Sequence, residues 1–126
     1  MNIPSNLKYT KDHEWILIDG KTGTIGITDY AQGELGDVVF IDIDPDQTGV
    51  AKGQSLGTIE AVKTVSDVFA PCSGNIIEVN KKLADNPEIV NSNPYDEGWM
   101  LKIEITNASE LSDLLDAKDY QKLIGQ

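Results

Sequence analysis

The 126-residue chain contains one cysteine, Cys72, one histidine, His13, and no arginine, so all ten basic residues are lysines. A single cysteine excludes an internal disulfide and a cysteine-based metal site, and a single histidine leaves too few ligands for a histidine-based zinc site. The lack of arginine also removes the side chain that binds phosphate and carboxylate groups bidentately. We therefore expect no metal site and no arginine clamp for an anionic substrate.

Basic residues and long apolar runs are also scarce. The 21 acidic residues outnumber the ten lysines and give a net charge of -11, which repels nucleic acid and favours basic partner surfaces. No apolar run approaches the ~20 residues that a membrane-spanning helix needs. Residues 1–4 carry neither the basic and apolar segments of a signal peptide nor the arginines of a transit peptide. We expect a cytoplasmic protein that binds neither nucleic acid nor membranes.

Short alternating segments separated by turns make up most of the chain. They predict strands over 13–19, 24–28, 38–43, 50–62, 64–70, 75–79, 88–90 and 99–106, with a polar turn over 81–87. Thr28 predicts the N-terminal cap of a short helix over 29–35, and Gly36 its end. Many short strands at this spacing are typical of a small sandwich or barrel.

The last twenty residues have a different pattern. Asn107 and Glu110 have the spacing of a capping box, and Asp116 is placed to cap a final helix. We therefore predict one mainly β domain over 1–126, a flattened sandwich of two antiparallel sheets. Its β core covers about 7–106 and its C-terminal helical segment about 107–126. The predicted core residues, with Trp15 and Leu17 on one face of their strand, are Trp15, Ile25, Ile27, Val39, Ile41, Ile59, Val68, Ile76, Val79, Leu101 and Ile103.

No self-contained active site is evident. Cys72 lies in a turn, where a small residue filling the turn is a better interpretation than a nucleophile paired with His13. Any pair chosen from 21 acidic residues is arbitrary, and the glycines at 33–36 and 49–57 are not followed by the Gly-Lys-Ser/Thr of a phosphate loop. We predict that the chain is not an enzyme.

Lys63 lies at the centre of the segment 57–67, between two strand-like runs. Turns of this kind normally carry Gly, Asn, Asp or Ser, so the apolar Val62 beside the lysine has no packing reason. An apolar residue is reasonable there if another protein recognises the turn and contacts that side chain. Lys63 is therefore predicted to anchor a prosthetic group, with Glu60, Val62 and Asp67 marking it for the attaching enzyme. An ordinary surface lysine is the alternative.

Two motifs around Lys63 resemble the lipoyl-domain family. Glu60 to Lys63 match the Glu-x-x-Lys of its hairpin turn, and the turn 71–74 matches the Ser-Gly turn that follows. Biotinyl relatives place methionine on both sides of the lysine, whereas Val62 and Thr64 flank it here. The resemblance implies a barrel-sandwich hybrid fold and lipoate covalently attached to Lys63.

Further blocks resemble the H-protein family of the glycine cleavage system over nearly the whole chain. They lie in order at 9–15, 26–32, 35–37, 62–67, 90–95 and 98–99. The resemblance implies a non-catalytic carrier. It would take an aminomethyl group from a pyridoxal-phosphate glycine decarboxylase to a tetrahydrofolate-dependent aminomethyltransferase, and dihydrolipoamide dehydrogenase would reoxidise it. A lipoate ligase or a lipoyl or octanoyl transferase would load Lys63.

The loaded arm is labile in water and carries a cationic amine, so shelter beside an acidic residue would protect it. Glu14 and Asp67 are the predicted contacts. Two other functions stay open at this point: a lipoyl carrier or relay protein for another lipoate-dependent pathway, and an unmodified binding module with the same fold.

Overall fold

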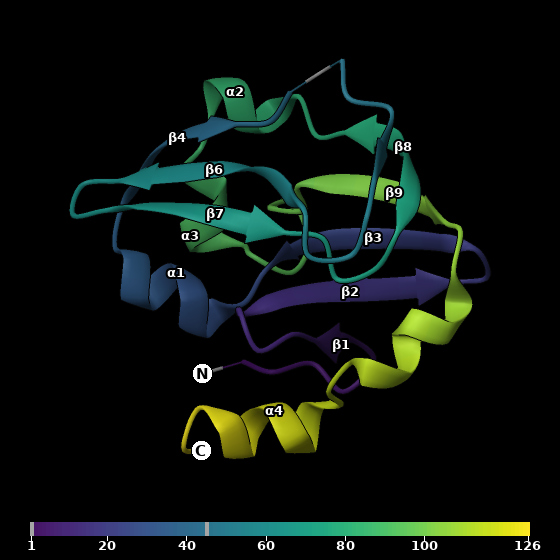
Figure 1. Ribbon diagram of the computed structural model, residues 1–126. Coiled ribbons are helices and arrows are strands. Elements are labelled where there is room, and N and C mark those ends of the chain that lie inside the picture. The colour runs from purple at the N-terminus through teal and green to yellow at the C-terminus, as the bar shows by residue number, and fades with distance from the viewer. Residues whose placement is uncertain (1, 45) are drawn as a thin grey trace.

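Two antiparallel β-sheets form the body of the protein in a computed structural model that describes residues 2–44 and 46–126 (Figure 1). A six-stranded sheet has the order β1-β2-β3-β9-β8-β5, and a three-stranded sheet has the order β4-β6-β7. The elements are β1 Lys8–Tyr9, β2 Glu14–Asp19, β3 Thr22–Ile27, α1 Asp29–Leu35, β4 Val38–Asp42, β5 Gly49–Val50, β6 Ser55–Ala61, β7 Val65–Phe69, β8 Gly74–Val79, α2 Lys82–Asp85, α3 Ile89–Ser92, β9 Leu101–Ile105, the 3₁₀ helix η1 Ala108–Asp113, and α4 Ala117–Leu123.

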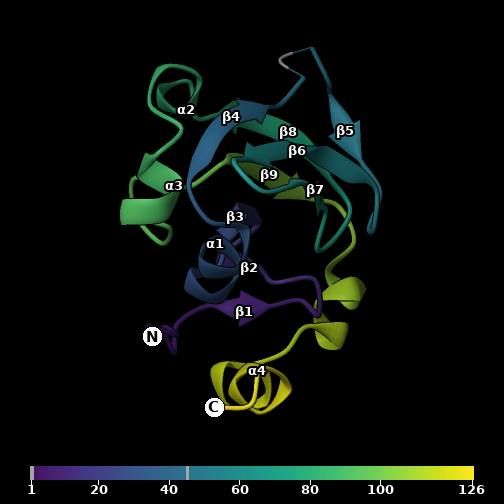
Figure 2. The same ribbon diagram turned by 90° about the vertical axis from the view of Figure 1, so that its left-hand side faces the viewer.

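The main core lies between the two sheets. Its fully buried members include Ile25, Ile59, Leu101 and Ile103, all of them expected core residues. In Figure 2 the three-stranded sheet lies above β1, β2 and β3 of the large sheet, and α4 lies on the far side beyond β1. The predicted flattened sandwich is confirmed. None of the helices in the described ranges is both long and apolar enough to cross a membrane.

Strand β2 is buried on both faces, which a simple alternating pattern does not predict. Ile16 enters the main core, while Trp15 enters a second cluster with Tyr9 and Tyr120. The Trp15 indole N–H donates to the Pro94 carbonyl at 3.0 Å. Trp15 and Leu17 lie on one face of β2, as expected for residues two positions apart in a strand, but only Trp15 is buried, and Leu17 is 37% exposed.

Strand β4 also departs from the prediction. Its register with β6 shifts between Val38 and Phe40, which marks a bulge. A bulge turns successive residues out of strict alternation. Val39, expected in the core, is consequently 51% exposed, and Phe40 beside it is exposed to the same extent.

Two local predictions fail where the chain closes into short helices. In place of the strand expected over 88–90, Ile89 and Val90 form the start of α3, and the turn expected over 81–87 contains α2. Val90 and Leu83 are buried from these helices, so their apolar side chains reach the core without a strand. The predicted arm over 50–62 is also interrupted, because 51–54 form a turn between β5 and β6.

Helix α1 follows the prediction closely. The Thr28 side chain accepts a hydrogen bond from the Ala31 N–H, and the Gly36 N–H donates to the Gln32 carbonyl. Gly36 has φ 81° and ψ -160°, a conformation that only glycine adopts readily. Gly36 therefore ends α1 and turns the chain into β4.

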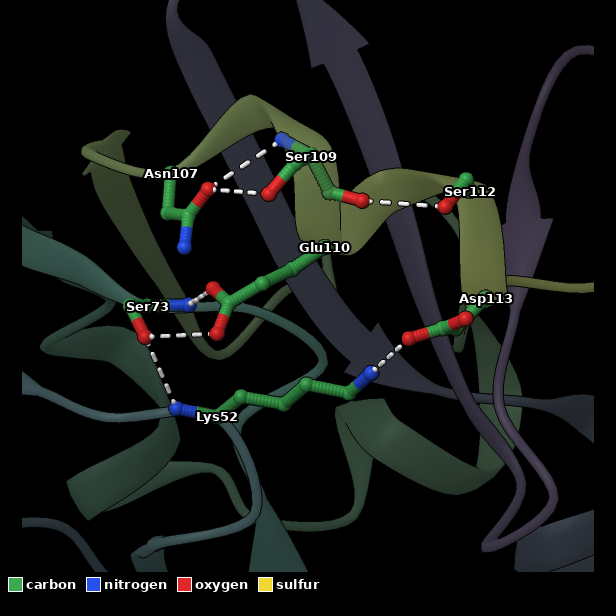
Figure 3. A network of polar contacts seen from close by, with 7 residues as sticks. All are labelled: Lys52, Ser73, Asn107, Ser109, Glu110, Ser112 and Asp113. Atoms are coloured by element: carbon green, nitrogen blue, oxygen red, sulfur yellow. Dashed lines mark hydrogen bonds and ion pairs between the residues drawn. The ribbon is translucent and has the colours of Figure 1, made fainter.

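Side chains attach the C-terminal segment to the turns around β5 and β8, and the predicted capping box forms only in part. Asn107 accepts from the Ser109 N–H, but Glu110 turns away and accepts from both the N–H and the hydroxyl of Ser73 (Figure 3). An ion pair at 2.6 Å joins Lys52 to Asp113 beside it. The reciprocal half of the capping box is thus wrong, because Glu110 has a better partner in the turn before β8.

Asp116 caps helix α4 as predicted, because its side chain accepts from the Asp119 N–H. Its buried Tyr120 stacks on Tyr9 with ring centroids 4.7 Å apart. The Tyr120 hydroxyl lies 2.7 Å from the Thr28 hydroxyl and 2.9 Å from His13 Nδ1. The helix therefore completes the second cluster and ties it to the start of α1.

Candidate functional site

Lys63 lies in the turn that joins β6 to β7, at the end of a hairpin that projects past α1 (Figure 1). Its side chain is exposed and forms no ion pair with any described residue. The Ala61 N–H donates to the Thr64 carbonyl at 2.8 Å and closes the turn around Val62 and Lys63. The lysine is therefore presented outward on two paired strands.

The conformation of the turn explains why Val62 is tolerated. Among described residues other than glycine, only His13 has a positive φ, so Val62 and Lys63 both have ordinary negative values. The two-residue hairpin turns that favour Gly and Asn require positive φ at one or both central positions. This turn instead receives support from outside, because the Val62 N–H donates to the Asp37 carbonyl at 3.0 Å.

The outer face of the three-stranded sheet carries exposed apolar side chains next to the turn. Phe40, Glu60 and Val65 lie side by side across β4, β6 and β7. Val65 is 58% exposed and Val62 is 72% exposed. Apolar groups gathered in this way are typical of a surface that another protein contacts.

A cavity of about 130 Å³ lies on the other side of β7, between that strand and α1. Four carboxylate residues and no lysine occur among its described lining residues. That lining consists of Asp12, His13, Glu14, Ile27, Ala31, Glu34, Leu35, Ile59, Ser66, Asp67 and Val68. Such a lining favours a ligand with an apolar body and a cationic group.

Glu14 is the buried acid of this cavity, with 2% of its surface exposed. Its Oε1 accepts from the Thr10 hydroxyl at 2.6 Å, and its Oε2 accepts from the Phe69 N–H at 3.3 Å. Burial raises the Glu14 pKa to about 7, while the Thr10 and Phe69 hydrogen bonds oppose the rise. At neutral pH the carboxyl is thus poised between its two protonation states.

The Phe69 hydrogen bond shows how the edge of the sheet is used. In an antiparallel pair, successive residues direct their backbone groups alternately toward and away from the partner strand. The Ala70 N–H donates to Gln54, whereas the Phe69 N–H points away from β6 and reaches Glu14. β7 is the last strand of its sheet, so its free edge borders the cavity.

Asp67 lies on this edge strand, but its side chain belongs to the outer face. It pairs with Thr58, one residue away from the inward-facing Ile59, and its carboxylate accepts from the Ser55 hydroxyl at 3.2 Å. Asp67 therefore lines the cavity as part of the strand. The Glu14 carboxyl is hydrogen-bonded to Thr10 and Phe69, which line a neighbouring cavity of about 280 Å³ that Glu14 also borders.

Cys72 and His13 have structural roles. Cys72 is fully buried in the main core, and burial raises its pKa to about 11, so the thiol is a poor nucleophile. His13 is hydrogen-bonded to Tyr120, and burial lowers its pKa despite the opposing charges of Asp12 and Glu34. The structure does not bring the two into a nucleophile–base arrangement.

Sequence reasoning missed Phe40 and Val65 as members of the outer face. The run Val38 to Ile41 is apolar throughout and gives no alternation from which a bulge can be predicted. What places both residues on the outer face is their pairing with Glu60, and this pairing is known only from the strand register of the structure.

Comparisons with known proteins bear on this arrangement. The family model described as Glycine cleavage H-protein matches residues 7–126. The chain belongs to the glycine cleavage H-protein family. A glycine cleavage system H protein of Chlorobaculum parvum is 56% identical over 128 aligned residues, and one of Staphylococcus carnosus is 48% identical over 126, each covering all of both chains. The crystal structure of a glycine cleavage system H protein from Mycobacterium marinum superposes with a TM-score of 0.90 at 38% identity, covering 98% of this chain and 100% of that one.

H proteins are the lipoylated, non-catalytic aminomethyl carriers of the glycine cleavage system. The chain is thus a carrier and not an enzyme, as the sequence predicted. Membership implies the P, T and L proteins of that system as partners. The family match over the whole chain favours this function over a carrier for another lipoate-dependent pathway.

Proposed function

We propose that Lys63 is the residue that carries lipoate in this H protein. The observation that supports this most directly is the position of Lys63 in an exposed turn between an apolar outer face and an acidic cavity. Lys21 provides a contrast. It also lies in a turn between paired strands, β2 and β3, but its neighbour Gly20 has φ 61° and the turn resembles an ordinary hairpin connection.

Bound lipoate, held on Lys63, would supply a disulfide that is reduced as one of its sulfurs takes the aminomethyl group and the other becomes a thiol; removal of that group would leave the dithiol. The chain's own contribution is to hold the anchoring lysine outward and to keep the hairpin beneath it rigid. In the proposed sequence of visits, a pyridoxal-phosphate glycine decarboxylase loads the carrier and a tetrahydrofolate-dependent aminomethyltransferase unloads it. Dihydrolipoamide dehydrogenase then restores the disulfide.

We propose that the enzyme that attaches lipoate recognises one surface around the turn. This surface is formed by Glu60, Val62 and Asp67, together with Phe40 and Val65. All five lie on the turn or on the outer face of the three-stranded sheet. The apolar members supply contact area, and the carboxylates select a partner with basic groups around its site. The enzyme proposed to recognise this surface is a lipoate ligase or a lipoyl or octanoyl transferase.

Glu14 and Asp67 are proposed to shelter the loaded arm in the cavity along β7. A cationic amine beside Glu14 would favour the ionised carboxylate and so form a buried ion pair. Asp67 adds negative charge at the mouth from the outer face. If neutralising both residues leaves the decomposition rate of the loaded arm unchanged, this shelter does not exist.

We further propose that 1–126 acts as one carrier domain in the cytoplasm. The relatives named above are bacterial, and the carrier has to meet three enzymes in turn. A location shared with those enzymes is therefore required.

The attachment site is tested by intact mass and peptide mapping after incubation with lipoate, ATP and a lipoate ligase. The wild-type protein and Lys21→Arg should each gain one lipoyl group on the peptide that contains Lys63, and Lys63→Arg should gain none. Persistence of the lipoyl group in Lys63→Arg would overturn the assignment. Failure of the wild type to gain it would favour an unmodified binding module.

A further inference from the structure

Asn91, in α3, makes three hydrogen bonds to the segment that supports the Lys63 turn. Its Nδ2 donates to the Gly36 carbonyl at 2.9 Å and to Gln32 Oε1 at 3.0 Å. Its Oδ1 accepts from the Val38 N–H at 2.8 Å. One partly buried side chain therefore fixes both the end of α1 and the start of β4.

The Val38 N–H and the Asp37 carbonyl belong to the same peptide unit. A trans peptide is planar, and its N–H and C=O point in opposite directions. When Asn91 holds the Val38 N–H, it therefore also fixes the direction of the Asp37 carbonyl. That carbonyl accepts from the Val62 N–H at 3.0 Å, and Val62 directly precedes Lys63.

We propose that Asn91 is a positioning residue for the lipoyl-bearing turn, acting through the 37–38 peptide and the Val62 N–H. Because Val62 and Lys63 have negative φ, their turn lacks the conformation that makes two-residue hairpins stable by themselves. The hydrogen bond from the Val62 N–H to the Asp37 carbonyl therefore supplies the stabilisation that the local sequence of the turn lacks. The Val62 side chain then remains outside, where a partner enzyme can contact it.

The segment that Asn91 holds also lies near the lysine. Gly36 has no Cβ, but one built on its backbone would come within 4.0 Å of Lys63 Cδ. Asn91 thus fixes the hydrogen-bond partner of the turn and the backbone close to the lysine stem. Its effect on function is indirect, since it contacts neither Val62 nor Lys63 in the recorded hydrogen bonds.

The test compares Asn91→Ala with Asn80→Ala. Asn80 is a suitable control because it is buried and also makes three hydrogen bonds, all of them to backbone groups away from the turn, at Glu97, Trp99 and Lys82. The Val62 amide of the apo protein should exchange with solvent about two- to tenfold faster in Asn91→Ala, as expected for the loss of one hydrogen bond's support. The ligase kcat/KM for lipoylation should fall by a similar factor. Asn80→Ala should change neither quantity beyond its effect on global stability.

A second pair of variants removes the same link from its other end and leaves Asn91 in place. Val62→Pro deletes the donating N–H, and Val62→Ala keeps the N–H while shortening the side chain. Val62→Pro should lose about two- to tenfold more ligase kcat/KM than Val62→Ala, and combining it with Asn91→Ala should add little further loss. This pair decides the matter if Asn91→Ala does not fold.

Equal lipoylation by Val62→Pro and Val62→Ala, or unchanged Val62 exchange in a folded Asn91→Ala protein, would overturn the proposal. The proposal rests on Lys63 as the attachment site, and its failure is distinguishable from failure of that assignment. Absence of lipoylation in the wild type counts against the attachment site, while Val62 amide exchange still tests Asn91 independently.

Discussion

Replacing Glu14 by glutamine should change how the stability of this H protein depends on pH. The glutamine side chain has the shape of the neutral acid, so its oxygen can accept from the Phe69 N–H while its amide donates to the Thr10 hydroxyl. The two hydrogen bonds that the Glu14 carboxyl makes to these partners are thereby retained in number. What the substitution removes is the ability to ionise in a buried position.

The magnitude follows from the pKa of Glu14, which burial raises from 4.5 to about 7. A carboxyl with a raised pKa binds its proton more tightly in the folded state than in the unfolded state. Its contribution to stability is therefore fully present below pH 4.5 and is lost as the pH rises through about 7. The shift converts to about 3 kcal/mol of unfolding free energy.

Urea unfolding of the apo proteins at about pH 4.5 and about pH 8 measures this effect. The free energy of Glu14→Gln minus that of the wild type should rise by about 3 kcal/mol between the two pH values. Glu88→Gln, at an exposed position in the turn before α3, serves as the matched control and should show little change. If the difference in unfolding free energy between Glu14→Gln and the wild type did not depend on pH, the raised pKa of Glu14 would be refuted. The proposal that Glu14 pairs with a cationic amine would then lose its support.

Three other substitutions test the remaining contacts. Phe40→Ala should lower ligase kcat/KM by about tenfold, while the unfolding free energy stays within about 0.5 kcal/mol because the ring is half exposed; an unchanged rate would remove Phe40 from the reading surface. Gly57→Ala should cost about 2 kcal/mol or more in urea unfolding, since its Cβ would overlap the Asp42 carbonyl oxygen; wild-type stability would show that the strands can separate there. Tyr120→Phe should cost about 1–3 kcal/mol and lower the melting temperature, because Thr28 and His13 lose their hydroxyl partner; an unaltered melting temperature would mean that water replaces it.

The sequence was sufficient wherever the physics is local. Thr28 and Gly36 bound α1 because a capping oxygen and a glycine-only conformation act within one turn of helix. Asp116 caps α4 for the same reason. Predictions failed where contacts with a distant segment outweighed the local pattern. Glu110 hydrogen-bonds to Ser73 instead of completing a capping box, and Val39 is exposed because of a bulge in the register with β6.

The family blocks and the proposed anchor Lys63 could be predicted from the sequence alone, because the anchor of a carrier is marked by a short motif that other enzymes recognise. The sequence also determined the mainly β fold, through the repeated strands and turns. Only the tertiary structure decided what surrounds the lysine. The cavity beside Glu14, the row of Phe40 and Val65, and the support from Asn91 each join residues from strands or helices far apart in the chain. Their energies depend on burial, register and hydrogen-bond direction, which exist only once the two sheets have packed.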